Sequence, residues 1–527
     1  MQLNALADRV GDLLLVGSPG ADAAPNAPPD IAETAGAILF ERDLQSVATA
    51  QGLVARLRGS SRPPRFIAVD QEGGPIARLR AIGTSTPSAM ALGAADDEAL
   101  THDIYALIGA ELAALGINLD LAPVADLNTN SSNPVIGLRS FGDDPQRVAR
   151  HVSAAIRGLH SAGIAAVAKH FPGHGDTALD SHKTLPVVEH DLARLRAREL
   201  VPFRAAIAAG VDILMSAHVA FPALEPTGVP ATLSRAILTG LLREELGFEG
   251  VICTDAMDMK AIADTYEPGD ASVRAVAAGA DLVLFERVDN ATRAAAALRD
   301  AVRAGTLDPG LVEKSLARVD ALRTKLAASS PPADSTGIGS SAHRRLAADA
   351  ARRAITLVRN PNAVLPLKPS ATDRILIVNF MPTEAGTKSS TGRVTSVLGA
   401  ALARGPARVQ EQIRSLDPAG QEYKQLLMAA GAASMFIAVT RRAASHPLQV
   451  QAVADLAMFG KPIVAIAALE PYDAGVLPQS IAVIATYGDG EDALAAAAET
   501  LMGTFTASGK LPVRVPQLQA AVTSQWQ

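Results

Sequence analysis

Residues 165–176 read AAVAKHFPGHGD, an uninterrupted apolar run that ends in charged and imidazole side chains. The proline and the two glycines that follow break any helix, so the run leads into a loop. A short run without polar alternation is typical of a parallel strand that is covered on both faces of its sheet. We therefore expect a buried strand over residues 165–170 and a loop with functional side chains directly after it.

The same pattern recurs along residues 1–326, where short apolar runs alternate with Ala/Leu/Arg-rich helical stretches. Eight such units fit a (β/α)8 barrel of the TIM type better than a doubly wound sheet. Several runs end in polar segments, namely VDQEGG, APVADLN, SAHV and TDAMD. In a barrel these ends lie together on the face where chemistry occurs. The other predicted strands are residues 12–16, 37–40, 65–70, 118–123, 213–218, 250–255 and 281–285.

The remaining third of the chain predicts a second, smaller domain. Residues 327–342, AASSPPADSTGIGSSA, have the Ser/Pro/Gly composition of a linker, whether a flexible tether or an ordered strap. Residues 343–527 again alternate strands and helices, which favours an α/β sandwich with a mostly parallel sheet. Its predicted strands are residues 355–358, 374–379, 435–439, 462–467 and 481–485.

The composition limits the possible partners. A net charge of -6 in 527 residues gives no basic footprint for nucleic acid, and 3% aromatic residues argue against a long stacking platform. No apolar stretch is long enough to span a membrane, and the start lacks the pattern of a secretory signal. The single cysteine, Cys253, excludes an internal disulfide. We therefore expect a cytoplasmic protein that binds neither nucleic acid nor membrane.

The densest cluster of reactive side chains is Lys169–Thr177, KHFPGHGDT, followed by Asp180-Ser181-His182. A carboxylate two residues from an imidazole can fix the ring tautomer and stabilise the imidazolium. The other ring nitrogen can then exchange a proton near neutral pH. Two alternatives remain open: a loop whose histidines cap backbone groups, or a metal site of His170, His174, His182 and an aspartate.

A second segment, GVICTDAMDM over residues 250–259, carries a carboxylate at the end of an apolar strand. Asp255 at this position could act as a nucleophile, a base or a metal ligand. We expect the neighbouring Asp258 to face the start of the following helix instead, where a carboxylate favours the helix dipole.

Three further segments offer groups that could hold a substrate. Asp70 and Arg78 flank the Gly-Gly turn of VDQEGGPIAR, and together they could grip sugar hydroxyls or form a structural salt bridge. Arg139 lies in NPVIGLRSFG, a loop with a single cation. His218 ends the SAH segment at another strand end, where we expect it to contact substrate.

Taken in order, these segments resemble glycoside hydrolase family 3. The match rests on KHFPGHGDT…DSH…LP over residues 169–186, with VDQEGG…R, RSFG and TDAMDM in support. The Asp-Ser-His loop resembles the bacterial β-N-acetylglucosaminidase branch. ARRAITLVRNPNAVLPL (351–367) and ASGKLPVRVP (507–516) resemble the second domain of two-domain members. One departure is Pro75, which stands where many relatives carry arginine.

The resemblance implies a role for each matching position. Asp255 would attack the anomeric carbon, and His182, oriented by Asp180, would act as acid and then as base. No cofactor or metal is implied. The non-reducing N-acetylglucosamine would be held by Asp70, Arg78, Arg139, Lys169 and His170.

These inferences lead us to expect a retaining exo-β-N-acetylglucosaminidase that acts on small saccharides from peptidoglycan. A phosphorylase that uses the same chemistry with phosphate as acceptor is the nearest alternative, and a β-glucosidase is disfavoured by the Asp-Ser-His loop. A non-catalytic sugar-binding module is also possible. A metal-dependent amidohydrolase on the same barrel would use His170, His174, His218 and Asp255.

Overall fold

The computed structural model describes residues 3–20, 34–59, 65–329, 337–382, 396–516 and 518. The chain divides into two compact units, one of residues 1–86 and 97–344 and the other of residues 87–96 and 345–527. Residues 87–96, which include helix α3 (Ala89–Ala95), group with the second unit, whereas the sequence pattern placed them in the barrel.

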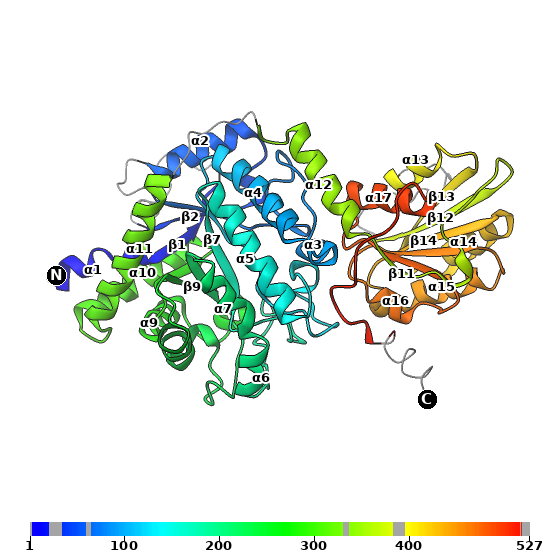
Figure 1. Ribbon diagram of the computed structural model, residues 1–527. Coiled ribbons are helices and arrows are strands. Elements are labelled where there is room, and N and C mark those ends of the chain that lie inside the picture. Colours follow the sequence, from blue (N-terminus) through cyan, green and yellow to red (C-terminus); the bar gives the residue numbers. More distant parts are fainter. Residues whose placement is uncertain are drawn as a thin grey trace. The chain divides into compact units, whose positions relative to one another are not determined.

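The first unit, which contains β1, β2, β7 and β9 of Figure 1, is a closed barrel. Its eight parallel strands have the order β1-β10-β9-β8-β7-β6-β3-β2. Each predicted apolar run overlaps one of these strands, so the predicted barrel is confirmed. Pairing is parallel throughout, as in Ala37↔Ile67 and Met215↔Cys253. The strands are β1 (Leu14–Gly17), β2 (Gly36–Leu39), β3 (Phe66–Val69), β6 (Leu119–Asp120), β7 (Ala165–Phe171), β8 (Ile213–Ser216), β9 (Val251–Ala256) and β10 (Leu282–Phe285).

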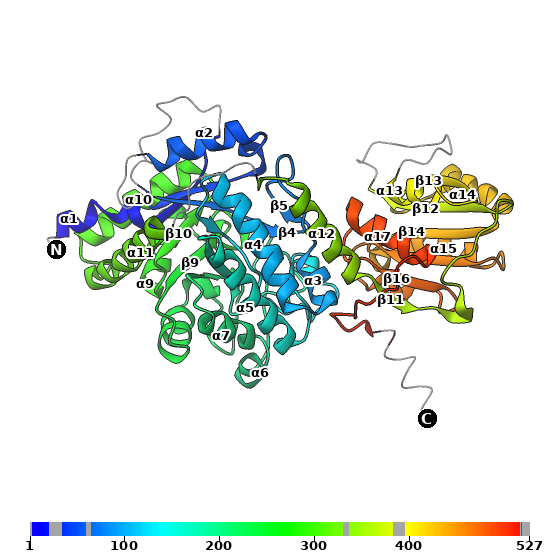
Figure 2. The same ribbon diagram turned by 45° about the horizontal axis from the view of Figure 1, so that its top comes forward.

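Apolar side chains fill the barrel interior, among them Phe66, Val167 and Ile213. Helix α11 (Pro309–Ser329) adds Val319 and Leu322 to this cluster. The other helices surround the strands (Figures 1 and 2). They are α1 (Leu3–Ala7), α2 (Val47–Arg58), α4 (Glu98–Ala114), α5 (Pro145–Ser161), α6 (Leu192–Ala197), α7 (Leu200–Ala208), α8 (Lys260–Ala263), α9 (Pro268–Ala278), α10 (Val288–Arg303) and the wider helical turn Ala236–Glu245.

Helices α4 and α5 show how particular residues start a helix and determine its packing in the layer around the barrel. Helix α5 begins with Asp144 as N-cap, whose side chain accepts the Arg147 N–H, and Pro145 occupies its first turn. Gly158 lies so close to α4 that a Cβ there would stand 2.4 Å from the carbonyl oxygen of His102. The two helices therefore pack backbone to backbone at this point.

The second unit contains a six-stranded sheet in the order β11-β16-β15-β14-β12-β13. Strand β11 is antiparallel to β16 and all other pairs are parallel. Five of these strands match the predicted ones; the sixth, β13, was not predicted and carries the polar sequence RVQEQIRS at the sheet edge. The strands are β11 (Thr356–Arg359), β12 (Arg374–Met381), β13 (Arg408–Ser415), β14 (Met435–Thr440), β15 (Ile463–Ala467) and β16 (Ala482–Ala485).

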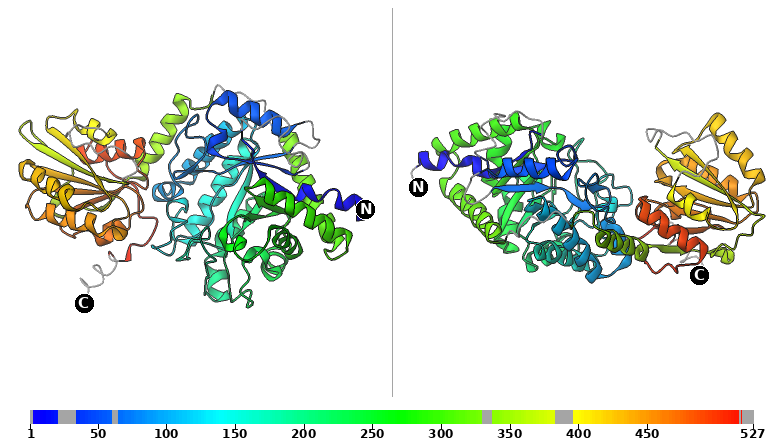
Figure 3. Two further views of the ribbon diagram at one scale, coloured as in Figure 1. Left: turned by 180° about the vertical axis from the view of Figure 1, so that it is seen from behind. Right: turned by 90° about the horizontal axis from the view of Figure 1, so that it is seen from above.

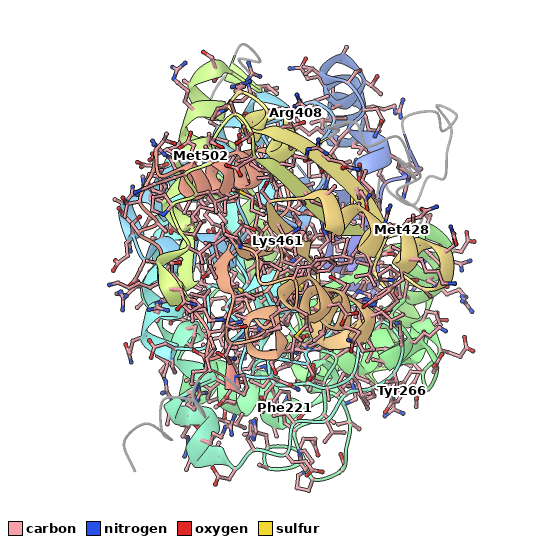
Figure 4. The ribbon with its side chains drawn as sticks, turned by 90° about the vertical axis from the view of Figure 1, so that its right-hand side faces the viewer. Phe221, Tyr266, Arg408, Met428, Lys461 and Met502 are labelled. Carbon is pink, nitrogen blue, oxygen red and sulfur yellow. The ribbon has the colours of Figure 1, made fainter. Side chains whose placement is uncertain are left out.

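Helices cover both faces of this sheet, as the two views of Figure 3 show. Helices α13 (Val397–Leu402) and α17 (Glu491–Met502) supply one apolar core. Helices α14 (Gly420–Ala432), α15 (Pro447–Ala457) and α16 (Asp473–Val476) supply the other. Lys461, labelled in Figure 4, donates to the carbonyls of Ala430 and Ala433 at the end of α14, where a cation favours the helix dipole. The expected α/β sandwich is thus confirmed.

Of the expected linker 327–342, residues 327–329 complete α11 and residues 341–342 begin α12 (Ser341–Ala354). Residues 330–336 lie outside the described part of the chain. No helix in the described residues combines the length and apolar character needed to cross a bilayer.

Candidate active site

A cavity opens at the carboxyl ends of the barrel strands. Seven of the nine predicted site residues line it, and Glu72, His174, Ser181 and Glu286 also contribute. Asp180 and His218 do not belong to the lining. The seven predicted residues that the fold brings together are Asp70, Arg78, Arg139, Lys169, His170, His182 and Asp255.

The floor of the cavity is a buried network of opposite charges. The carboxylate of Glu72 accepts hydrogen bonds from Nε and Nη2 of Arg139, each at 2.8 Å. The Lys169 ammonium lies 2.7 Å from Glu72 and 2.7 Å from Asp70. Burial raises the pKa of Glu72, but the two cations outweigh it and hold that pKa well below its usual range. Glu72 therefore keeps its charge and fixes both cations in place.

A short hairpin after β3 positions Arg78. It consists of β4 (Gln71–Gly73) and β5 (Ile76–Ala77), both labelled in Figure 2, and turns at two glycines with positive φ. The side-chain oxygen of Gln71 accepts the N–H of Arg78 at 2.7 Å. Arg78 Nη2 then lies 3.8 Å from Asp70, so these two residues form an ion pair and also line the cavity.

A second buried carboxylate, Asp126, organises the histidines after β7. One oxygen accepts from the His170 ring at 2.7 Å, and the other accepts the backbone N–H of His174 at 2.6 Å. Burial raises the pKa of Asp126, but the charge and hydrogen bond of His170 outweigh it and lower that pKa. Because Asp126 holds Nδ1 of His170, Nε2 is the nitrogen that points toward Arg139, at 3.4 Å.

Asp255 lies on β9 and faces the cavity. Its Oδ1 accepts the N–H of Ala256 at 2.8 Å. Burial alone would raise the pKa of Asp255, but the rings of His170 and His218 outweigh it and hold the pKa below its ordinary value. The carboxylate is therefore ionised, which is the form that a nucleophile requires.

Asp180 and His182 form the expected pair on the loop after β7. Asp180 Oδ1 accepts from His182 Nδ1 at 2.8 Å and from the His182 backbone N–H at 2.9 Å. Burial alone would raise the pKa of Asp180, but these hydrogen bonds outweigh it and hold that pKa below its ordinary value. The His182 side chain is 61% exposed, and its Nε2 has no hydrogen-bond partner within the described residues. This nitrogen is available for proton transfer.

His218 does not occupy the expected position in the cavity. It is fully buried, its Nδ1 lies 2.8 Å from the hydroxyl of Thr232, and its Nε2 donates to the carbonyl of Ala256 at 3.0 Å. Both ring nitrogens are thus engaged directly behind the nucleophile strand. In this geometry no ring nitrogen of His218 is left without a partner, and direct contact with a substrate stays a prediction.

Asp258 also differs from expectation. Its carboxylate accepts the backbone N–H groups of Glu286 and Arg287 and the side chain of Asn290, so it faces the turn before α10 rather than the start of α8. It therefore ties the nucleophile segment to the end of β10. Glu286 at that end reaches the cavity, and burial together with the neighbouring carboxylates raises its pKa.

The histidines are arranged for hydrogen bonding rather than for metal ligation. Within the described ranges, no group of three or more His, Cys, Asp or Glu side chains could hold a metal ion. Nδ1 of His174 contacts Thr177, and its Nε2 contacts Ser181. His218 is engaged on both nitrogens as described above. This geometry opposes the alternative of a metal-dependent amidohydrolase.

Glu72 and Asp126 belong to the site although neither was among the residues predicted from the sequence. Both are acidic and lie near ends of barrel strands, which is the signal that could have identified them. Their partners Arg139 and His170 are 67 and 44 positions away along the chain.

Comparison with known proteins covers both units. The glycosyl hydrolase family 3 N terminal domain matches residues 6–322, and the family 3 C-terminal domain matches residues 355–526. Beta-hexosaminidase A of Pseudoalteromonas piscicida is 35% identical over 93% of this chain and 91% of that protein. A beta-hexosaminidase of Pseudomonas aeruginosa is 42% identical over 48% of this chain and 75% of its own length.

The structural comparison gives the same relationship. A glycoside hydrolase family 3 beta-N-acetylglucosaminidase from a Paenibacillus species superposes with a TM-score of 0.87 at 36% identity, over 97% of this chain and 99% of that one.

Proposed function

This chain belongs to glycosyl hydrolase family 3, and from that premise we propose that it is a retaining exo-β-N-acetylglucosaminidase. Its relatives named beta-hexosaminidase and beta-N-acetylglucosaminidase support the glycoside hydrolase activity. The observation that carries the proposal is one cavity lined both by a partly buried carboxylate with a lowered pKa and by an imidazole with a carboxylate partner.

In the first step, Asp255 attacks the anomeric carbon of the non-reducing N-acetylglucosamine and the bond to the leaving oxygen breaks. His182 Nε2 protonates that oxygen as it departs, and Asp180 stabilises the ring as its charge changes. In the second step, the neutral imidazole removes a proton from water, which displaces Asp255 and releases the sugar with its anomeric configuration retained.

The sugar-binding groups are Asp70, Arg78, Arg139, Lys169 and His170, all of which line the cavity. Asp70 offers carboxylate oxygens to sugar hydroxyls while Lys169 and Arg78 hold it in place. For His218 we propose a supporting role: its ring fixes the carbonyl of Ala256, the residue after the nucleophile.

We also propose that residues 327–342 connect a barrel domain, 1–326, to a second domain, 343–527.

We further propose that the natural substrates are small peptidoglycan fragments in the cytoplasm. The single cysteine, Cys253, supports a reducing compartment because no internal disulfide can form. The substrate assignment follows from the N-acetylglucosaminide specificity that the Asp-Ser-His loop implies.

Initial rates on a chromogenic β-N-acetylglucosaminide and on the matching β-glucoside test the proposal. We expect the N-acetylglucosaminide to be cleaved with a kcat/KM at least about tenfold higher, which corresponds to about 1.4 kcal/mol in the transition state. Preference for the glucoside would reject the assignment.

A further inference from the structure

Along the loop that carries the Asp180–His182 pair, Asp180 is partly buried, Ser181 is buried and His182 is exposed. Ser181 is 1% exposed, in contrast to the 61% exposure of the neighbouring His182 side chain. Ser181 is therefore the buried anchor between the two residues of the pair, and its contacts help to set where the pair lies.

The ring of His174 holds the side chain of Ser181. His174 Nε2 lies 2.9 Å from the Ser181 hydroxyl, and its Nδ1 lies 2.9 Å from the hydroxyl of Thr177. The His174 backbone N–H donates to the buried Asp126 at 2.6 Å. Ser181 is thus connected, through one buried imidazole, to the same carboxylate that orients His170.

The backbone of Ser181 is held from the opposite side. Its carbonyl accepts the N–H of Ala261 in α8, the helix that begins four residues after the end of strand β9, which carries Asp255. The two hydrogen bonds of Ser181 therefore join the loop after β7 to the segment that presents Asp255. They fix the acid/base loop relative to the carboxylate on the neighbouring side of the cavity.

We propose that His174 and Ser181 form a clamp that positions the Asp180–His182 pair for proton transfer to the leaving group. This inference rests on the proposed function of that pair. His174 and Ser181 are positioning residues: the hydrogen-bonding groups of both side chains are occupied by each other and by Thr177.

The clamp keeps one charge state across the working pH range. Burial, together with the adjacent His170 ring, lowers the pKa of His174 to about 4. Its neutral ring carries one N–H and one acceptor nitrogen, and each hydroxyl partner can either accept or donate. Both bonds of the clamp are therefore satisfied without a charge.

The test is Ser181→Ala, with kcat/KM measured on a series of aryl N-acetylglucosaminides of increasing phenol pKa and on an N-acetylglucosamine disaccharide. Because kcat/KM reports the first step, it isolates protonation of the leaving group. Loss of one positioning hydrogen bond is expected to cost roughly 3- to 10-fold on the disaccharide. The most activated aryl substrate, which needs little protonation, should change less than about twofold. Equal losses across the series, or no loss, would overturn the clamp.

Two further variants keep the result interpretable. Ser181→Cys preserves the buried volume but is a weak hydrogen-bond donor, so it should show the same selective loss if Ser181→Ala folds poorly. Thr184→Ala removes an exposed hydroxyl from the same loop and should leave all substrates unchanged. A selective loss in Thr184→Ala would overturn the specific role of Ser181.

His182→Ala separates this inference from the proposed function. If that variant shows the strong leaving-group dependence and Ser181→Ala does not, the clamp alone is wrong. If His182→Ala itself shows none, the acid assignment fails and the clamp fails with it.

Discussion

Glu72 and Arg139 form a bidentate ion pair in the lining of the cavity, where Nε and Nη2 of Arg139 each lie 2.8 Å from a carboxylate oxygen of Glu72. The same carboxylate lies 2.7 Å from the Lys169 ammonium. One buried carboxylate thus pairs with two of the cations that line the sugar site, and Asp70 is the second carboxylate beside Lys169. The substrate-binding geometry therefore depends on a residue that we do not expect to touch the substrate.

Glu72→Gln is predicted to damage both stability and binding. Arg139 would lose its carboxylate partner and Lys169 would lose one of its two, and breaking a buried ion pair costs about 3–5 kcal/mol. Thermal unfolding and the KM for an aryl N-acetylglucosaminide measure the two effects. Glu267→Gln is the matched control, because the Glu267 side chain is 82% exposed and forms a surface ion pair with Arg293. A Glu72→Gln enzyme that is as stable as this control would contradict the prediction.

The contribution of Glu72 to the free energy of unfolding should decrease in acid and stay constant near neutral pH. Its folded-state pKa is depressed below the ordinary value of 4.5, so protons bind preferentially to the unfolded chain. The stabilisation is complete above pH 4.5 and decreases as the pH falls toward the folded-state pKa. We therefore expect the difference in unfolding free energy between wild type and Glu72→Gln to be constant near neutral pH and to shrink in acid. A difference that grows in acid would contradict this sign.

The barrel could be predicted because its strands contain short apolar runs, such as residues 165–168, and such runs are typical of buried parallel strands. The edge strand β13 could not be predicted, because RVQEQIRS has no continuous apolar run. It forms a strand by pairing with β12 in the folded sheet. Edge strands carry polar residues, and in a single sequence such a stretch is indistinguishable from a loop.

Contacts within the site could be predicted where the two partners are close together in the sequence. Asp180 and His182 are two residues apart, so their pairing could be expected from the sequence alone. Glu72 and Asp126 find their partners only in the folded barrel. His218 shows the limit of a strand-end position: the sequence places it there, but the direction of its ring depends on Thr232 and Ala256, which only the fold brings next to it.

Asp255→Ala is predicted to abolish turnover while the protein remains folded. Both chemical steps pass through the bond to this carboxylate, so its loss should reduce kcat by several orders of magnitude. Circular dichroism and thermal unfolding check the fold, and a chromogenic N-acetylglucosaminide checks the activity. Activity near that of wild type would remove the nucleophile assignment.

His182→Ala is predicted to impair a disaccharide far more than an activated aryl glycoside, because a low-pKa phenol departs without an acid. Asp180→Asn should give a smaller loss of the same kind, since it disturbs only the orientation and tautomer of the ring. The ratio of kcat/KM values for the two substrates measures the effect. An unchanged ratio in His182→Ala would argue against its role as the acid.

Hydrolysis rather than phosphorolysis is the predicted main reaction. A neutral imidazole does not repel phosphate, so the Asp180–His182 pair permits both acceptors. The cations Lys169 and Arg139, however, are already held by Glu72, and Glu286 adds negative charge to the cavity. Product analysis with millimolar phosphate should find free N-acetylglucosamine in excess. N-acetylglucosamine 1-phosphate as the main product, with a large rate increase, would show a phosphorylase.

The covalent intermediate on Asp255 is the central claim, and trapping it is the most direct test. A 5-fluoro glycosyl fluoride of N-acetylglucosamine has a good leaving group but slows both steps, because the ring fluorine destabilises the oxocarbenium-like transition state. Intact-protein mass spectrometry followed by peptide mapping would locate the sugar. We predict one sugar per chain, attached to the peptide that contains Asp255. Turnover without any labelled protein, or a label on another residue, would contradict the account.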